Sequence, residues 1–134
     1  MEKQGKVTGI GGIMFRSKDV QGTKDWYAKH LGLDVDAYGS TFTFIDSSTK
    51  KEAILQWSPM EETSDYIGEE EQQVMVNYRV DDLDKLLEQF KQAGVNILGD
   101  IQSFEYGRFL HIMDNEGRRV ELWEPIDGPL LPKA

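Results

Sequence analysis

Apolar and polar residues alternate along this chain in a pattern that predicts one series of secondary-structure elements occurring twice. In the first half, Asp19 is a candidate helix N-cap, because its short side chain can accept a hydrogen bond from the first helical turn, and Gly32 is a candidate C-cap. The pattern predicts a strand at Val7–Arg16, a helix at Asp19–Leu31, and strands at Leu33–Val35, Thr41–Ile45 and Ala53–Trp57.

The second half repeats this order. An apolar row at helical spacing predicts an amphipathic helix that is capped by Asp81 or Asp82 and ends at Gly94. The members of the row are Leu83, Leu86, Leu87 and Phe90. Strands are predicted at Val74–Val80, Val95–Leu98, Ile101–Tyr106, Phe109–Met113 and Arg119–Trp123. We therefore interpret each half as one repeated unit, which consists of a strand, a helix and three further strands.

Two landmarks support an internal repeat. A shift of 66 positions places Trp57 on Trp123, each two residues before a proline, and a shift of 63 places Asp19 on Asp82. Self-similarity at half the chain length predicts two copies of one supersecondary unit. Two copies are too few for a solenoid, so we expect them to face each other and enclose a space.

The segment between the two copies, Ser58–Gln72, is rich in acidic residues. We interpret most of it as a solvated acidic linker. Tyr66 and Ile67 are apolar exceptions, which either tuck inward or form part of a lid.

Length and composition restrict the classes of function. The 134 residues fit one compact domain, with one module at about 7–60 and another at about 73–125 sharing a core. A net charge of −9 argues against nucleic acid and anionic membranes as partners. The absence of cysteine excludes disulfides and thiolate chemistry. No apolar stretch of membrane-spanning length and no apolar leader are present, so we expect a cytoplasmic protein.

Strand alternation separates an apolar face from a mixed one. Gly12, Met14 and Arg16 share one face of the first strand, and Asn77 and Arg79 lie on the matching face of its repeat. Charged and amide groups do not make a dry core, so we expect this face to be a cavity wall or a solvated concave surface.

Glu121 has two interpretations. If Trp57 and Trp123 are equivalent, Glu121 points into the concave side together with both tryptophans. The alternative is a glutamate on the solvent side of an edge strand, paired with Arg119.

Other candidates also have a functional and a structural interpretation. His111 is either an acid or base or a half-buried strand residue with a satisfied ring. In the functional interpretation, Arg108 clamps a carboxylate or phosphate and Tyr106 hydrogen-bonds to or stacks on a substrate. In the structural interpretation, both residues belong to a surface turn. Trp57 and Trp123 line an apolar ligand pocket, or they fill the core or a dimer interface.

The order of these pieces resembles a known superfamily. The signals are Asp82-Leu83-Asp84 at the second helix, the run from Asp114 to Trp123, Trp26-Tyr27, and His30-Leu31-Gly32-Leu33. Together they resemble the glyoxalase/bleomycin-resistance/dioxygenase, or vicinal oxygen chelate, superfamily from about Gly9 to Pro125. The resemblance implies an α+β fold of two βαβββ modules that curl around a cleft, a homodimer, and a small-molecule ligand.

In the metal enzymes of that superfamily, side chains from the first and last strand of each unit hold a divalent ion. The resemblance puts these positions on Gly12, Met75, Leu55 (Gln56 if the alignment slips by one) and Glu121. Only Glu121 matches a ligand, and one carboxylate does not hold a catalytic ion against water. We therefore expect a degenerate metal site and no cofactor.

The function that we expect is binding, or binding and transformation, of a small organic molecule in the cleft. The candidate catalytic residues are Glu121 and His111. The candidate ligand-binding residues are Arg16, Trp57, Asn77, Arg79, Tyr106, Arg108, Glu121 and Trp123. One alternative is a metal-dependent lyase, an isomerase resembling lactoylglutathione lyase, or a dioxygenase, with the ligands Glu121, His111 and Gln56. Others are a drug-sequestering resistance protein and an interaction module without a ligand.

Overall fold

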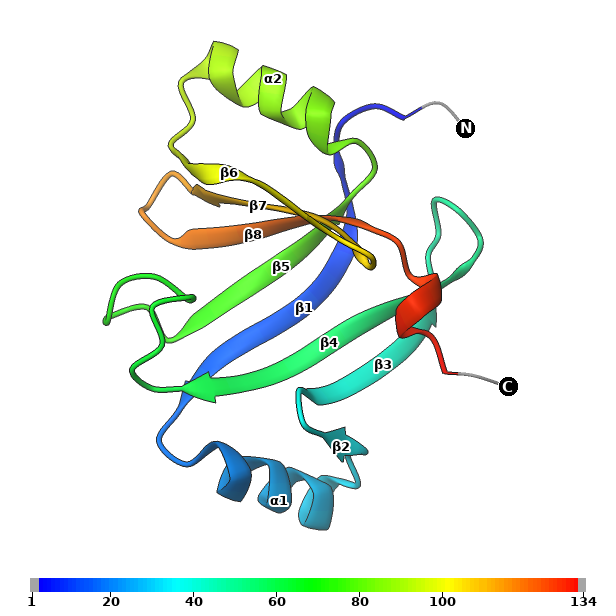
Figure 1. Ribbon diagram of the computed structural model, residues 1–134, viewed down its shortest axis with the longest axis vertical. Coiled ribbons are helices and arrows are strands. Elements are labelled where there is room, and N and C mark those ends of the chain that lie inside the picture. The colour runs from blue at the N-terminus through cyan, green and yellow to red at the C-terminus, as the bar shows by residue number, and fades with distance from the viewer. Residues whose placement is uncertain (1–2, 133–134) are drawn as a thin grey trace.

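The two halves of the chain form one continuous eight-stranded sheet in the computed structural model, which describes residues 3–132 (Figure 1). The strand order is β2-β3-β4-β1-β5-β8-β7-β6. The strands are β1 (Val7–Ser17), β2 (Val35–Asp36), β3 (Gly39–Ile45), β4 (Glu52–Glu61), β5 (Val74–Val80), β6 (Ile97–Phe104), β7 (Gly107–Met113) and β8 (Arg119–Pro125). The helices are α1 (Val20–Leu31), α2 (Leu83–Ala93) and the short 3-10 helix η1 (Gly128–Leu130).

The pairing confirms a doubled βαβββ architecture. In each half the first strand runs parallel to the last, β1 beside β4 and β5 beside β8, and the helix lies in the connection that parallel pairing requires. The antiparallel pair β1–β5 joins the halves at the centre. In Figure 1 the sheet curls between α1 and α2, which lie at opposite ends of the molecule.

Both helices begin and end where the sequence predicted. Asp19 accepts a hydrogen bond from the backbone N–H of Gly22 at 2.9 Å, and Asp82 accepts one from Lys85 at 3.0 Å. Gly32 and Gly94 end the helices in the left-handed conformation, with φ of 72° and 75°. Beneath α2 a hydrophobic core contains Val80, Leu83, Leu86, Leu110 and Leu122.

The register corrects the predicted equivalence of the two tryptophans. Gly12 of β1 lies opposite Gln56 of β4, and Asn77 of β5 lies opposite Glu121 of β8. The repeat in the sheet is therefore a shift of 65 positions, which makes Gln56 the counterpart of Glu121. A difference of one residue reverses the face of a strand residue, so Trp57 and Trp123 lie on opposite faces of the sheet.

The strand pattern between α2 and β7 also differs from the prediction. Val95–Leu98 and Ile101–Tyr106 were predicted as two strands, but the single strand β6 (Ile97–Phe104) contains parts of both and the residues between them. Gly99 has a φ of 82°, and the register with β7 shifts between Leu98 and Gln102. A residue in this conformation interrupts the alternation without ending the strand, which explains the error.

The inner face of the curled sheet is buried, so of the two interpretations given for it, a cavity wall or a solvated concave surface, the solvated surface is wrong. Met75 is 0% exposed, Asn77 4% and Arg79 2%. Ile67, from the segment between the halves, packs against Met14 and Met75 and is itself 0% exposed. The face is not solvated because Ile67 packs inward onto it, which is one of the two predicted arrangements, and because its polar groups form hydrogen bonds within the protein.

Candidate functional site

Four positions from the first and last strand of each half meet at the centre of the inner face. Gly12 pairs with both Gln56 and Asn77, and Asn77 pairs with Glu121. The superfamily resemblance put the metal-ligand position of the last strand on Glu121. The residue beside it on the first strand of the same unit is Asn77, so the predicted ligand position at Met75 is wrong by two residues. The same register selects Gln56 over Leu55.

Glu121 is the centre of a buried hydrogen-bond network. Its side chain is 4% exposed. Asn77 Nδ2 donates to Glu121 Oε1 at 2.7 Å, His111 Nε2 lies 2.8 Å from Glu121 Oε2, and the Tyr66 hydroxyl donates to the same Oε2. The interpretation of Glu121 as a solvent-facing residue paired with Arg119 is therefore wrong. A carboxylate buried at this depth is tolerated because donors surround both of its oxygens.

Arg119 determines the tautomer of His111. The Arg119 Nε–H donates to His111 Nδ1 at 2.7 Å. Because an arginine nitrogen is only a donor, Nδ1 must be the unprotonated nitrogen of a neutral ring, and the proton lies on Nε2. His111 Nε2–H therefore donates to Glu121. Both ring nitrogens are satisfied, in agreement with the structural interpretation of this residue.

Tyr66 reaches the site from the segment Glu62–Gln73, which connects β4 to β5 and which we call the β4–β5 loop. The ring meets the His111 ring edge-on, with centroids 5.0 Å apart at 78°. Burial first, and then the charge of Glu121, raise the pKa of the Tyr66 hydroxyl well above its ordinary value of 10.0. Tyr66 is nevertheless 42% exposed, because only its hydroxyl end is enclosed. Of the two predicted arrangements of Tyr66 and Ile67, the inward one is present.

Arg16 holds the β4–β5 loop. Its guanidinium donates five hydrogen bonds to backbone carbonyls within the loop. The acceptors are Glu62, Ser64, Gly68, Glu69 and Gln72. Most side chains of the segment are exposed, as predicted for a solvated acidic linker, but its backbone is closed around the Arg16 side chain. The loop lies at the left of Figure 1, between the end of β4 and the start of β5.

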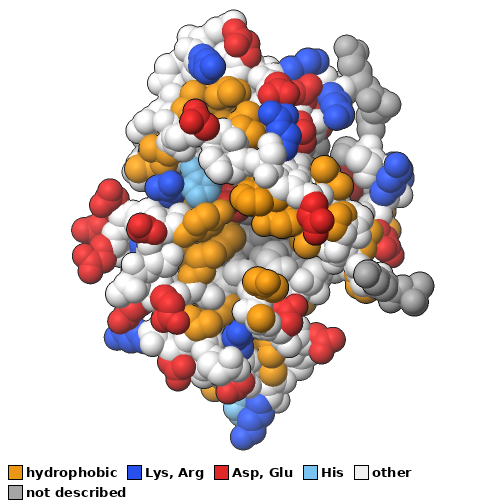
Figure 2. Space-filling view, in the orientation of Figure 1, with side chains coloured by type: hydrophobic (Ala, Val, Ile, Leu, Met, Phe, Trp, Pro, Cys, Tyr) orange, Lys and Arg blue, Asp and Glu red, His pale blue; other side chains and the backbone are white. Residues whose placement is uncertain are grey.

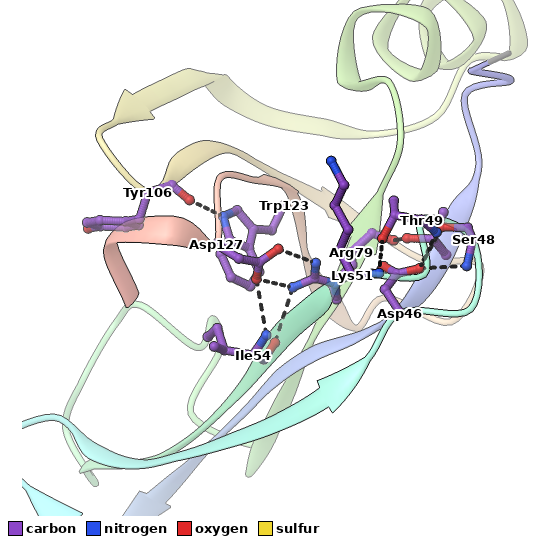
Figure 3. A network of polar contacts seen from close by, with 10 residues as sticks. Asp46, Ser48, Thr49, Lys51, Ile54, Arg79, Tyr106, Trp123 and Asp127 are labelled. Carbon is purple, nitrogen blue, oxygen red and sulfur yellow. Dashed lines mark hydrogen bonds and ion pairs between the residues drawn. The ribbon is translucent and has the colours of Figure 1, made fainter. Parts of the chain in front are cut away.

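Arg79 is likewise paired within the protein (Figure 3). Its guanidinium forms two hydrogen bonds with the Asp127 carboxylate, at 2.8 and 2.6 Å, and one with the Ile54 carbonyl at 3.2 Å. Asp46, in the turn between β3 and β4, lies 3.5 Å from Arg79 Nε. The guanidinium also lies 5.2 Å from the Trp123 ring centroid. Arg79 thus joins the C-terminal segment and the β3–β4 turn to the sheet.

The remaining predicted ligand residues are divided between the two faces. Trp123 is on the inner face, 2% exposed, and stacks on Phe109 with ring centroids 5.7 Å apart. Trp57 packs against Phe15 and Tyr27 on the face that carries α1, away from Glu121.

The predicted loop beside the cleft is the turn from β6 to β7. Tyr106 stacks on Phe104, and its carbonyl accepts a hydrogen bond from Trp123 Nε1 at 2.9 Å. Arg108 pairs with Asp84 of α2 at 2.9 Å and with Glu124 at 3.6 Å. The structure therefore brings Asn77, His111 and Glu121 together and directs Arg108 toward α2.

Three buried side-chain atoms of the described residues have no hydrogen-bond partner, and one of them, Arg79 Nε, lies 3.5 Å from the Asp46 carboxylate. The other two are Asn77 Oδ1 and Gln56 Nε2, an acceptor and a donor on strands that flank β1. Gly11 provides the space above Asn77, because a Cβ there would lie 2.3 Å from Asn77 Oδ1. Unsatisfied buried groups are uncommon in native proteins and indicate a place where a ligand atom or water completes the site.

The donor set does not fit a divalent ion. Three donors point at Glu121, and His111 presents an N–H to the site. A histidine that ligates a metal through Nε2 normally donates from its other nitrogen, whereas His111 Nδ1 accepts from Arg119. Within residues 3–132, no group of three His, Cys, Asp or Glu side chains converges in a way that could hold a metal.

Comparison with known proteins gives the family. The model of the Glyoxalase/Bleomycin resistance protein/Dioxygenase superfamily matches residues 9–122. The chain belongs to this superfamily. The superfamily assignment confirms the resemblance from which the fold was predicted, and the α+β fold of two βαβββ units is the vicinal oxygen chelate fold. No curated protein matches the chain.

Solved structures with the superfamily fold include methylmalonyl-CoA epimerases. The enzyme from Mycobacterium tuberculosis is 19% identical, with a TM-score of 0.62, over 97% of this chain and 96% of that one. A variant of the Streptomyces coelicolor enzyme in complex with 2-nitronate-propionyl-CoA is 17% identical, with a TM-score of 0.67, over 92% and 100%. A superfamily member from Vibrio splendidus 12B01 is 12% identical, with a TM-score of 0.55, over 90% and 99%. At these identities the likeness concerns the fold.

The sequence did not identify two residues of the site. Tyr66 lies in a loop, where strand alternation gives no information on direction, and its only signal was an aromatic residue within an acidic stretch. Arg119 was considered only as a partner of Glu121, although two-residue alternation places both on one face of β8. Among the described residues, no helix is long and apolar enough to cross a membrane.

Proposed function

We propose that the chain binds a small organic molecule on the inner face of the sheet, at Glu121, without a resident divalent ion. The observation that supports the proposal best is the direction of the three donors around the Glu121 carboxylate. One donor, Tyr66, belongs to a side chain that is 42% exposed. A ligand with a hydroxyl or N–H group could replace it and would meet an acceptor that is already oriented.

The surroundings have the composition of a small-molecule site. Such sites combine apolar walls with a few fixed polar groups. Here Phe109 and Trp123 provide stacked ring surfaces, and Asn77 Oδ1 and Gln56 Nε2 are unpaired. Figure 2 shows apolar side chains gathered across the middle of the molecule, with acidic side chains around them. Two surface hollows of 460 and 570 Å³ adjoin the β4–β5 loop, and Glu121 lines neither, so a ligand would enter by displacing a side chain.

A ligand screen tests this proposal. Compounds that raise the melting temperature of the wild type should fail with Glu121→Gln, because a ligand stabilises only the state that binds it. The shifts should persist in EDTA, and the protein soaked with nickel, zinc, manganese or iron and then dialysed should retain no stoichiometric metal. Compounds that bind the wild type and Glu121→Gln equally would overturn the location of the ligand site at Glu121. Compounds that bind only with added metal would overturn the proposal that the site works without a divalent ion.

Proton transfer is a second candidate function. When Tyr66 leaves, Glu121 Oε2 regains a free lone pair, and Asn77 and His111 still hold the carboxylate in place. A positioned carboxylate can take a proton from a ligand carbon; its return to the opposite face of that carbon is the chemistry of an epimerase, and its return to a neighbouring atom that of an isomerase. Exchange of deuterium from D₂O into a bound compound distinguishes this activity from sequestration of a drug or another ligand. The exchange should disappear in Glu121→Gln.

Homodimerisation and a cytoplasmic location stay predictions. The superfamily resemblance supports a dimer, and apolar side chains such as Ile13 and Val74 are exposed on the outer face of the central strands. Light scattering at several protein concentrations would test the dimer. A monomer at all concentrations would contradict it.

A further inference from the structure

We propose that Tyr66 occupies the place of the ligand's own aromatic hydroxyl group, so that the site takes a neutral phenol and Tyr66 competes with it as a side-chain gate. This inference rests on the proposed ligand site at Glu121. It adds the chemical class of the ligand and the way in which the ligand enters.

The first argument is the orientation of Tyr66. Its hydroxyl donates to the buried Glu121 carboxylate, and its ring lies edge-on against His111. The adjacent Ile67 is completely buried, whereas Tyr66 remains 42% exposed. The side chain therefore enters the site from the surface with its hydroxyl end leading, as a bound phenol would.

The second argument is the chemistry of the acceptor. A carboxylate with no cation in contact repels carboxylates and phosphates and accepts from neutral donors. Among the described residues, the side-chain hydrogen bonds to Glu121 come from Tyr66, Asn77 and His111, and the Arg119 Nε–H is bonded to His111. The same negative charge, together with burial, keeps the Tyr66 hydroxyl protonated by raising its pKa. A phenol in the place of Tyr66 would be held in its neutral form for the same reasons.

The third argument is that Tyr66 can move without the loop. Arg16 holds the loop through backbone carbonyls, Ile67 is anchored in the methionine cluster, and Gln72 bonds to the N–H and C=O of Arg119 at 2.8 and 2.9 Å. None of these contacts involves the Tyr66 ring. Rotation of a single exposed side chain is fast, so the gate opens without unfolding of the segment.

The ring surfaces near the site fit an aromatic ligand. His111 already makes an aromatic contact with Tyr66, and Phe109, two residues earlier on β7, stacks on Trp123. These three rings lie on the same inner face of neighbouring strands. A ligand ring would therefore keep the aromatic contact that Tyr66 loses when it rotates away.

The experiment uses three probes on the full chain: p-cresol, 4-methylanisole, which has no donor, and p-toluate, which is an anion. Calorimetry or ligand-observed NMR measures their binding to the wild type, Tyr66→Phe and Tyr66→Ala. Hydrogen bonds to charged groups are strong, so p-cresol should bind Tyr66→Phe roughly tenfold more tightly than the wild type, and Tyr66→Ala at least as tightly as Tyr66→Phe. On each variant 4-methylanisole should bind roughly tenfold more weakly than p-cresol, and p-toluate should not bind.

Three outcomes would overturn the inference. Equal binding of p-cresol and 4-methylanisole to Tyr66→Phe, which is nearly isosteric with the native residue, would exclude recognition of the hydroxyl. Equal p-cresol affinity of the wild type and Tyr66→Phe would exclude competition. Ile67→Ala is the matched control that loosens the loop and leaves the Tyr66 hydroxyl in place. A gain in p-cresol affinity with Ile67→Ala larger than that with Tyr66→Phe would indicate movement of the whole loop.

Failure of this inference is distinguishable from failure of the proposed function. If compounds from the screen bind in a Glu121-dependent manner but p-cresol does not, the phenol and the gate are wrong and the site remains. If no compound binds in a Glu121-dependent manner, either to the wild type or to the Tyr66 variants, both the ligand site at Glu121 and the phenol gate are wrong. Far-ultraviolet circular dichroism of each variant verifies that it is folded.

Discussion

Arg79→Ala tests whether this arginine stabilises the fold or serves a ligand. The guanidinium is 2% exposed and makes three hydrogen bonds, two of them to Asp127. Removing one partner of a buried ion pair costs about 3–5 kcal/mol, because the other charge is left buried. Asp127 is 16% exposed and can turn partly toward water, and the buried Asp46, 3.5 Å from Arg79 Nε, keeps its hydrogen bonds to Ser48 and Thr49. We therefore expect a loss near the lower end, about 3 kcal/mol of unfolding free energy.

Urea unfolding followed by circular dichroism measures this loss. For a chain of this size the corresponding decrease in melting temperature is about 10 °C. Arg79→Lys retains the charge but not the planar fork, so it should recover only part of the stability. The matched control is Arg118→Ala, which removes an exposed arginine that is ion-paired to Asp114 and Glu116 and should leave stability unchanged.

A double-mutant cycle identifies the cause. Arg79→Ala and Asp127→Ala should together cost clearly less than the sum of the single losses, because the second change removes a charge that the first has already left unpaired. A loss below about 1 kcal/mol for Arg79→Ala, the value of an exposed pair, would refute our assignment of a structural role. The arginine would then be available for the ligand role that the sequence suggested.

Three further predictions concern protonation. In nitrogen-15 NMR spectra, His111 should be the tautomer with its proton on Nε2, and loss of the Arg119 side chain should allow the other tautomer. Burial and the charge of Glu121 raise the pKa of Tyr66, so at high pH the folded state keeps a proton that the unfolded state releases. The difference in unfolding free energy between the wild type and Tyr66→Phe should therefore be constant below about pH 10 and decrease above it. Urea unfolding measures this difference. Partial burial alone would raise the pKa of Asp81, but three backbone N–H donors of the N-terminal segment lower it below 3.8. Asp81→Asn should therefore destabilise the protein at neutral pH, and melting curves should converge with those of the wild type as the pH falls through the folded pKa.

Local chemistry made most of the fold predictable. Helix ends depend on short-range hydrogen bonds and on left-handed glycines, so Asp19, Gly32, Asp82 and Gly94 could be assigned from the sequence. Strand alternation likewise assigned the faces of β1 and β5 correctly. Register was harder, because a shift of 66 satisfies the sequence motif whereas the hydrogen-bonded sheet uses a shift of 65. One position decides which tryptophan lines the site.

The site itself depends on contacts that local patterns do not contain. Glu121 and Asn77 are 44 residues apart, and Tyr66 lies 55 residues from Glu121. Arg16 and Arg79 were predicted to bind ligands because charge on a concave face suggests a solvated cavity. In the structure each pairs with a segment whose path the sequence did not predict: the β4–β5 loop for Arg16, and the C-terminal segment for Arg79.

The way in which Arg16 holds the β4–β5 loop has a consequence for how the protein can evolve. The carbonyl oxygens that accept its hydrogen bonds are present whatever side chain a position carries. In the described structure, none of the loop's carboxylates takes part in those hydrogen bonds. The shape of the loop is thus largely independent of its amino-acid sequence, and mutations there can change the surface charge, or the residue at position 66, while the backbone keeps its course. New ligand preferences could arise in such a segment by single substitutions that leave the scaffold intact.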